Sequence, residues 1–361
     1  MAWIFRGNKL DNITKNNRLF WIDIIRIIAI IAVVAIHVED SFIFYWNKIP
    51  LTDWWASNIY NGFIRFPVPI FLILSGYLLL DKQEDDKIFF SKRFSKVVIP
   101  LVAWSMIYWV FKNNYNVLSL FTVSFVQQLF ANKIYFHLYF LYVIIGLYLI
   151  TPLLRRILVH ASAYDVRYYL VLWLFFVPIS SLLGLLGYRN GIPLVAATWD
   201  FGFFFIGYVI KKTRITKKIV YLSSLLVIVS IVVTIIGTYY LTGRSENFYG
   251  SVHVLFAITS VTYSPCLFIL IQAIFSRFSV GIGSASGKLI NAIGRATMGI
   301  YLVHPMLLHF IVHGVSGIRL LSVKVLSPIV SIPLVTFLLV VLSFIIVLIL
   351  QKVPLLKKIV P

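Results

Sequence analysis

Long apolar runs separated by short polar connections dominate the chain. Ten runs reach or approach the roughly 20 residues that an α-helix needs to cross a bilayer. They cover approximately residues 19–38, 60–80, 97–111, 134–151, 168–187, 194–210, 219–240, 252–275, 290–313 and 327–351. The pattern predicts an all-α, polytopic integral membrane protein with about ten transmembrane helices, since helices satisfy their backbone hydrogen bonds internally in lipid.

No internal repeat, low-complexity tract or soluble domain interrupts this pattern. Residues 1–361 are therefore predicted to form a single transmembrane domain, with short tails at about residues 1–18 and 352–361. The first run is not a cleavable signal peptide, because it is too long, carries Asp23 and Arg26, and precedes no small-residue cleavage site.

The charge balance follows the same pattern. The chain has 32 Lys and Arg against 12 Asp and Glu, for a net charge of +20, although 60% of it is hydrophobic. One set of alternate connections and tails carries 23 basic residues and the other set carries 7, while Arg26 and Arg65 lie within runs. Because cytoplasmic connections are enriched in Lys and Arg, both termini are predicted to be cytoplasmic. The basic excess is a topology signal, and we expect no nucleic-acid partner.

The first run, WIDIIRIIAIIAVVAIHVED, carries three ionisable residues on one face. At about 100° per residue, Arg26 and His37 lie about 20° apart and about 16 Å apart along the axis, and Asp23 shares their stripe. Ionisable side chains in membranes generally face a protein interior or a cavity. Arg26 suits a phosphorylated donor, and His37 can take a proton from a hydroxyl. The alternative is a structural Asp23–Arg26 pair beside a hydrogen-bonded His37.

The second run contains Arg65 and is interrupted by Pro67 and Pro69. Broken helices within membranes tend to line cavities. The small pair Ser75–Gly76 either allows close helix packing or belongs to a binding site.

A basic cluster, SKRFSK, follows the second run. Its Lys92, Arg93 and Lys96 lie at the predicted inner face of the membrane. They would either clamp the phosphates of a nucleotide or anchor the chain as positive-inside residues.

Two later runs combine histidine with aromatic residues. The stretch IYFHLYFLY places His137 and Tyr139 near the predicted outer surface, where aromatic side chains form either an interfacial belt or a rim that stacks on sugars. The stretch GIYLVHP places Tyr301 and His304 before Pro305. A histidine beside a proline kink is either structural or part of a site.

Several kinds of function have no support in the sequence. There is no GxSxG, Walker A, HExxH or CxxC motif. The seven His residues are scattered, so we expect no metal site. The one cysteine, Cys266, cannot form an intrachain disulfide.

Five stretches, in order along the chain, resemble motifs of acyltransferase family 3, the integral-membrane O-acyltransferases. The family's opening D-x-x-R-x(10)-H motif is similar to WIDIIRIIAIIAVVAIH, and its F-x-x-x-S-G-[FY] run to PVPIFLILSGYLLL. Its basic R-x-x-R-x-x-x-P element is matched by FFSKRFSKVVIPL, and its fourth-helix block by HLYFLYVIIGLYLITPLL. Its late S-x-x-[IV]-Y-L-x-H-P signature is similar to IGRATMGIYLVHP.

The resemblance implies transfer of an acyl group, usually acetyl, from cytosolic acyl-CoA to a carbohydrate hydroxyl. It makes His37 the essential catalytic histidine, Arg26 a contact to the CoA donor and Arg93 part of the basic element. Ser75 and Gly76, and Tyr301 with His304, match further motif positions; these are taken as acceptor-binding or structural, together with Arg65, His137 and Tyr139.

Three features depart from the family pattern. Lys96 stands where the family often has Arg, so a bidentate phosphate contact is not expected there. The fourth-helix block lacks the Glu found in many members, and Ala296–Thr297 stand near the usual late Ser. This version of the block resembles stand-alone proteins that acetylate bacterial surface polysaccharides.

We therefore expect an O-acetyltransferase of the bacterial cytoplasmic (inner) membrane that acts on O-antigen or a related glycan. His37 and Asp23 are the predicted catalytic residues, and Arg26, Lys92, Arg93 and Lys96 the predicted donor site. Acetyl-CoA enters as a substrate, with no tightly bound cofactor. The acceptor is a lipid-linked or periplasmic carbohydrate, and membrane lipids are the other expected partners. The alternative is a transporter or flippase of a glycan intermediate or organic anion, which the broken second run and the buried charges also suit.

Overall fold

A computed structural model of the protein describes residues 20–185, 188, 198–244, 248–278, 284–313 and 326–361. Within these residues all regular structure is helical, which confirms the predicted all-α class. The α-helices are α1 (Phe20–Ile43), α2 (Leu51–Ile64), α3 (Pro67–Leu79), α4 (Asp86–Lys112), α5 (Val123–Phe130), α6 (Tyr139–His160), α7 (Ala163–Leu185), α8 (Trp199–Lys212), α9 (Lys217–Arg244), α10 (Phe248–Phe275), α11 (Ala285–His313) and α12 (Pro328–Leu350).

Nine spans among the described residues are long and apolar enough to cross a membrane, which confirms a polytopic membrane protein. The pair α2–α3 counts as one of these spans, broken at Arg65–Phe66 where Pro67 begins α3, as the prolines predicted. The sixth predicted run, 194–210, corresponds to α8, of which 14 residues are described, and residues 194–197 lie outside the described residues. The orientation with both ends cytoplasmic stays a prediction.

Several helices extend beyond the apolar runs that predicted them. The helix α4 begins at Asp86 instead of residue 97, because Asp85 caps it by accepting hydrogen bonds from the backbone N–H groups of Lys87 and Ile88. Its first turns are polar, so a hydropathy pattern does not detect them. In the same way α1 continues past residue 38 through Glu39 and Asp40 to Ile43.

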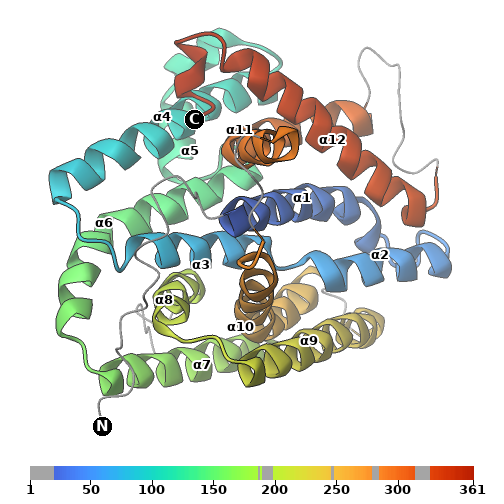
Figure 1. Ribbon diagram of the computed structural model, residues 1–361. Helices are drawn as coiled ribbons and strands as arrows, with labels where there is room; N and C mark the ends of the chain where they lie inside the picture. Colours follow the sequence, from blue (N-terminus) through green and yellow to red (C-terminus); the bar gives the residue numbers. More distant parts are fainter. Residues whose placement is uncertain (1–19, 186–187, 189–197, 245–247, 279–283, 314–325) are drawn as a thin grey trace.

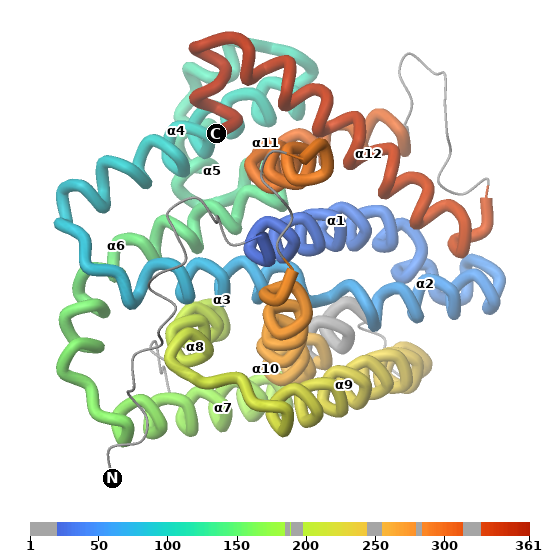
Figure 2. The backbone as a smooth tube through the Cα atoms, in the orientation of Figure 1, coloured from blue at the N-terminus to red at the C-terminus, as the bar shows by residue number. Residues whose placement is uncertain are grey.

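The helix α1 lies at the centre of the bundle, in contact with α2, α3, α11 and α12 (Figures 1 and 2). The helix α3 packs against α8, and α9 packs along α10 on the side of the bundle away from α12. Most apolar side chains of α1 are buried by these neighbours. Two polar side chains of this helix, Asp23 and Glu39, are buried as well and therefore lie against protein.

The α3–α8 contact explains the small pair in the second run. A Cβ atom on Gly76 would lie 1.7 Å from the backbone oxygen of Phe204, and one on Gly207 would lie 2.0 Å from that of Ile73. The two backbones thus touch at these glycines. Ser75 donates a hydrogen bond of 2.8 Å to the carbonyl oxygen of Phe71 within its own helix.

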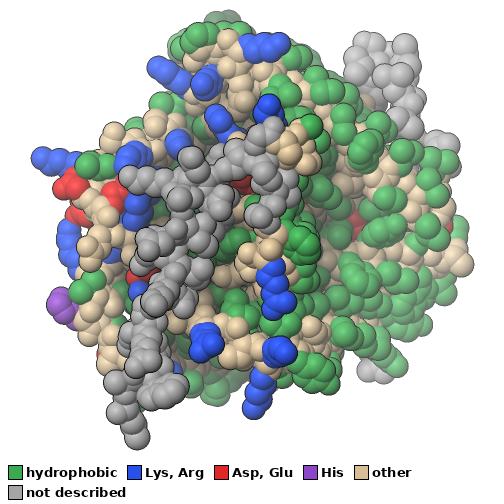
Figure 3. Space-filling model, in the orientation of Figure 1, with side chains coloured by type: hydrophobic (Ala, Val, Ile, Leu, Met, Phe, Trp, Pro, Cys, Tyr) green, Lys and Arg blue, Asp and Glu red, His purple; other side chains and the backbone are tan. Residues whose placement is uncertain are grey.

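Charged and apolar side chains occupy different parts of the surface. Lys and Arg side chains gather on the left, upper and lower central parts of the face shown in Figure 3, while its right flank is mostly hydrophobic. The charged end of the bundle is also linked by ion pairs, such as Lys211 and Lys212 with Asp81. This end comprises the end of α3 and the start of α4, and corresponds to the predicted cytoplasmic side.

Candidate active site

A histidine and a carboxylate face each other near the end of α1. His37 Nδ1 lies 3.7 Å from Asp40 Oδ2, one helical turn further along. This distance exceeds a hydrogen bond, but catalytic contacts are often loose without substrate and close by small rotations. The His37 side chain is 20% exposed, so a small molecule can reach it. An Nδ1–H directed at Asp40 leaves Nε2 as a proton acceptor.

Arg65 holds this carboxylate from the break between α2 and α3. Its Nη2 lies 3.0 Å from Asp40 Oδ1 and 3.2 Å from Glu39 Oε2, and its Nε donates to Asn61 Oδ1. Glu39 is fully buried and accepts a 2.8 Å hydrogen bond from the Ser57 hydroxyl. The helix break therefore has a structural consequence, because it presents Arg65 to two carboxylates of α1.

Two further imidazoles lie beside His37. The His304 ring is stacked on it at 5.4 Å between centroids, and His137 lies 6.1 Å from His304. His304 Nδ1 is 3.1 Å from the carbonyl oxygen of Ile300; because a carbonyl only accepts, Nδ1 carries the proton and Nε2 is an acceptor. Among the described residues, neither His304 Nε2 nor either ring nitrogen of His137 has a hydrogen-bond partner, and both side chains are buried.

The two aromatic residues that the sequence singled out, Tyr301 and Tyr139, have different surroundings. Tyr301 is buried in the imidazole cluster, and its hydroxyl donates to the carbonyl oxygen of His137. Tyr108, which the sequence did not single out, packs its ring 4.9 Å from His137 and donates to the carbonyl oxygen of Leu302. Tyr139 is 40% exposed.

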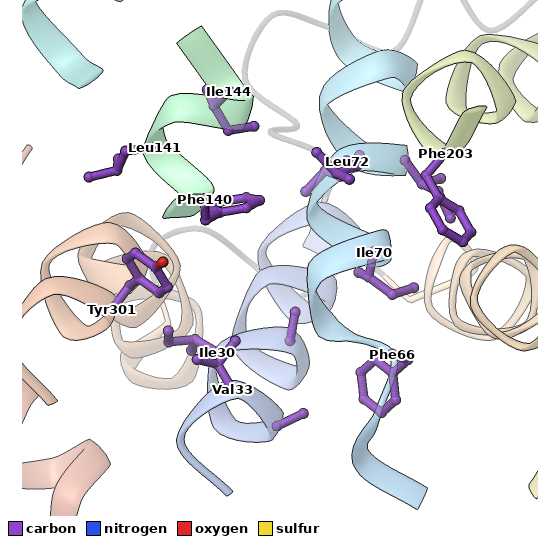
Figure 4. Close-up of a cluster of buried hydrophobic side chains, with 14 of the residues drawn as sticks. Ile30, Val33, Phe66, Ile70, Leu72, Phe140, Leu141, Ile144, Phe203 and Tyr301 are labelled. Carbon is purple, nitrogen blue, oxygen red and sulfur yellow. The ribbon is translucent and has the colours of Figure 1, made fainter. Parts of the chain in front are cut away.

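Arg26 lies at the other end of the same face of α1, with apolar residues between it and His37. Figure 4 shows Ile30 and Val33 of α1 opposite Tyr301 of α11 and Phe140 of α6. Arg26 Nη1 pairs with Asp23 Oδ1 at 3.3 Å, as the sequence allowed. Asp23 therefore lies with Arg26, about 21 Å along the axis from His37 by the rise of an α-helix.

Arg26 opens onto two cavities of about 490 and 860 Å³. The smaller cavity brings together the predicted donor residues and Ser75, with lining residues that include Arg26, Ser75, Lys92, Arg93, Lys96 and Tyr148. The larger cavity shares Arg26, Lys96 and Tyr148, and adds Arg295, Lys357 and Lys358 among others. Among the described residues, no Asp or Glu side chain lines either cavity.

Glu84 lies beside this region and organises part of its positive charge. Its carboxylate is 3.0 Å from Lys92 Nζ, 3.0 Å from Arg93 Nη1, 3.4 Å from Lys82 Nζ and 3.9 Å from Arg155 Nη2. Burial raises the pKa of the Glu84 carboxyl, but the hydrogen bond from Lys92 and the charge of Arg93 lower it to about 2 overall. Glu84 is thus an anion at neutral pH that pairs with Lys92 and Arg93 at the edge of the smaller cavity.

The structure gathers the predicted residues into two groups. One group lies on the donor side, around the two basic cavities. The other is a histidine group that includes Arg65, His137, Tyr301 and His304. Sequence reasoning missed Asp40 and Glu84. The spacing of Asp40, three residues after His37 on a helix, is the signal that identifies it. Among the described residues, no group of three or more His, Cys, Asp or Glu side chains is placed to hold a metal ion.

Comparison with known proteins identifies the family of the chain. The model of a family described as an acyltransferase domain, acyltransferase family 3, matches residues 19–348. No curated protein and no solved structure matches the chain. The match includes α1 with Arg26 and His37, the broken α2–α3 pair, and α11 with His304. The chain therefore belongs to acyltransferase family 3 and is a multi-pass membrane acyltransferase.

Proposed function

We propose that this acyltransferase moves an acetyl group from acetyl-CoA to a hydroxyl of a bacterial surface polysaccharide such as O-antigen, in the bacterial inner membrane. The observation that carries the proposal is the polarity of one face of α1. Arg26 opens onto basic cavities at one end, and His37 meets Asp40 at the other.

The basic cavities are the proposed donor site. Arg26, Lys92, Arg93 and Lys96 supply charge-assisted hydrogen bonds to the phosphates of CoA. The cavity volumes suit a cofactor-sized ligand. To reach His37, the thioester arm must then pass Ile30 and Val33, which are apolar and buried in the core beside α1. It must cover about 16 Å to reach His37.

His37 is the proposed general base. Its Nδ1–H is oriented by Asp40, so Nε2 takes the proton of the acceptor hydroxyl. The hydroxyl oxygen forms a bond to the thioester carbonyl carbon, and the carbon–sulfur bond breaks. The CoA thiolate leaves and takes up the proton from His37, so the base is regenerated. The buried His304 ring stacks on His37 next to this position, and its Nε2 is an unpartnered acceptor among the described residues.

A glycan analysis tests the proposal. Cells that carry the wild-type chain should yield surface polysaccharide heavier by one acetyl group than cells without it. His37→Gln should lower this acetylation at least about 100-fold, the usual contribution of a general base. His160→Gln, which changes an exposed histidine at the end of α6, should leave it unchanged.

Three outcomes would overturn the proposal or part of it. Unchanged acetylation in His37→Gln at normal protein levels excludes His37 as the base. Radiolabel retained by the wild-type protein after exposure to labelled acetyl-CoA without acceptor, and lost in His37→Gln, would instead make His37 an acyl carrier. Flux of a glycan or organic anion into vesicles without acyl-CoA would support the transporter alternative.

A further inference from the structure

The last eleven residues of the chain form a fixed structure instead of a free tail. After α12, residues 351–361 turn back and include the 3₁₀ helix η4 (Leu356–Lys358). Trp104 of α4 donates a 2.9 Å hydrogen bond to the carbonyl oxygen of Ile359, and Gln351 donates one of 3.0 Å to that of Val360. Val360 is fully buried. Figure 1 shows the C-terminus beside α4.

This folding places two lysines in the wall of the larger cavity. Lys357 and Lys358 line it together with Arg295 of α11 and with Arg26 and Lys96. Among the described residues, no acidic side chain forms an ion pair with Arg295, Lys357 or Lys358. Three cations from two separate elements thus line one cavity, to which the described residues contribute no acidic side chain; Pro361, the last residue of the sequence, also lines it.

The other cationic group of the region is already partly neutralised. Lys92 and Arg93, in the smaller cavity, are paired with Glu84. The two cavities share Arg26, Ser95, Lys96 and Tyr148 in their linings, so they adjoin. The combined cleft therefore has two separated sites for negative charge, one at each side of Arg26 and Lys96.

Coenzyme A also carries negative charge at two separated places, the diphosphate and the 3′-phosphate of the ribose. We propose that Arg295, Lys357 and Lys358, here called the tail site, bind the 3′-phosphate and select phosphorylated CoA over its 3′-dephospho form. This inference rests on the proposed acyl-CoA donor. The two lysines lie beyond residue 348, where the family match ends, so the site adds to what the family match covers.

Equilibrium binding of two probes to the full chain tests the tail site without needing an acceptor. The probes are CoA and 3′-dephospho-CoA, titrated by calorimetry into protein in neutral detergent. The wild type should bind CoA about tenfold more tightly, since a hydrogen bond to a charged group is worth at least that much. Lys357→Gln with Lys358→Gln should abolish the preference and leave the dissociation constant of 3′-dephospho-CoA within about twofold.

Two further variants make the test specific. Lys352→Gln changes a lysine of the same segment that does not line the cavity, and should keep the tenfold preference. Trp104→Phe removes the hydrogen bond that holds Ile359 and leaves both lysines in place. It should reduce the preference without changing the binding of 3′-dephospho-CoA, because the lysines are then less well positioned.

The outcomes distinguish an error in the tail site from an error in the proposed acyl-CoA donor. Wild-type protein that binds both probes equally, or a double variant that loses both equally, overturns the tail site and leaves the acyl-CoA donor standing. Wild-type protein that binds neither probe overturns both.

Anionic lipid is the other source of the same phosphate chemistry. Titration in nanodiscs of phosphatidylcholine, with and without phosphatidylglycerol, distinguishes it. A 3′-phosphate site keeps its preference for CoA in both discs. If Lys357 and Lys358 stabilised the protein only in discs with phosphatidylglycerol, and the two probes bound equally, the tail site would be a lipid site. That result would overturn the proposal.

Discussion

Asp40 Oδ2 lies 3.7 Å from His37 Nδ1, while the other oxygen of the same carboxylate is held 3.0 Å from Arg65. The carboxylate is thus fixed between a group that orients it and a histidine that it can orient. Arg65 is itself held by the buried Glu39. A histidine positioned by a fixed carboxylate presents one nitrogen to the substrate in a single tautomer.

Asp40→Asn should lower kcat about 10- to 100-fold, the usual effect of losing the partner of a functional histidine. The amide keeps the shape of Asp40 but no longer favours the His37 tautomer that carries Nδ1–H. The KM for acetyl-CoA should stay within about twofold, because the proposed donor site is about 16 Å away along α1.

Asp53→Asn provides the matched control for this variant. Asp53 is at the same end of the bundle and accepts a hydrogen bond from Ser327, away from His37. It should leave both kinetic constants unchanged. If Asp40→Asn raised KM and left kcat unchanged, Asp40 would not act through His37.

The Arg65–Glu39 pair should show strong energetic coupling. Arg65→Met leaves the fully buried Glu39 carboxylate without its ion-pair partner, and removal of one member of a buried pair costs about 3–5 kcal/mol. Glu39→Gln in the same chain should recover much of this loss. Unfolding of the purified protein by heat and by detergent measures both variants. Additive effects of the two substitutions would contradict a direct pair.

Gly76→Ala should destabilise the α3–α8 contact by about 1–3 kcal/mol, the cost of overpacking. The added Cβ would lie 1.7 Å from the backbone oxygen of Phe204, which cannot move aside independently of α8. Gly146→Ala is the control, because nothing lies within 4 Å of a Cβ there. It should stabilise α6 by roughly 0.5–1 kcal/mol. Equal unfolding temperatures for the two variants would show that α3 and α8 separate more easily than this contact implies.

The sequence predicts what depends on local pattern. Apolar runs of about 20 residues identify the spans, and Pro67 with Pro69 identifies the break after α2. The stripe on α1 follows from helical periodicity, which places Arg26 and His37 on one face. The five motifs also led to the family that the comparison confirms.

What the sequence did not predict depends on partners from other helices. Asp40 lies beyond the end of the first apolar run, and its link to Arg65 requires the packing of α2 against α1. Glu84 lies in a short connection, and its importance appears only when Arg93 and Arg155 converge on it. The tail site is hidden for the same reason, because Lys357 meets Arg295 only after the chain turns back at α4.

Glu84 should make the stability of the fold depend on pH in the acidic range. Its pKa is lowered to about 2 in the folded protein, against an unperturbed value of about 4.3. A group with a lowered folded pKa stabilises the fold at pH values above its unfolded pKa. This stabilisation is lost as the pH falls from about 4.3 to about 2. Glu84→Gln should therefore unfold at a lower temperature than the wild type at pH 7, and the difference should shrink in that acidic window.

Asp86→Asn, which breaks an exposed pair with Arg156, should cost about 0–1 kcal/mol. A wild-type advantage over Glu84→Gln that stays constant down to pH 3 would show that the ion pairs of Glu84 do not lower its pKa.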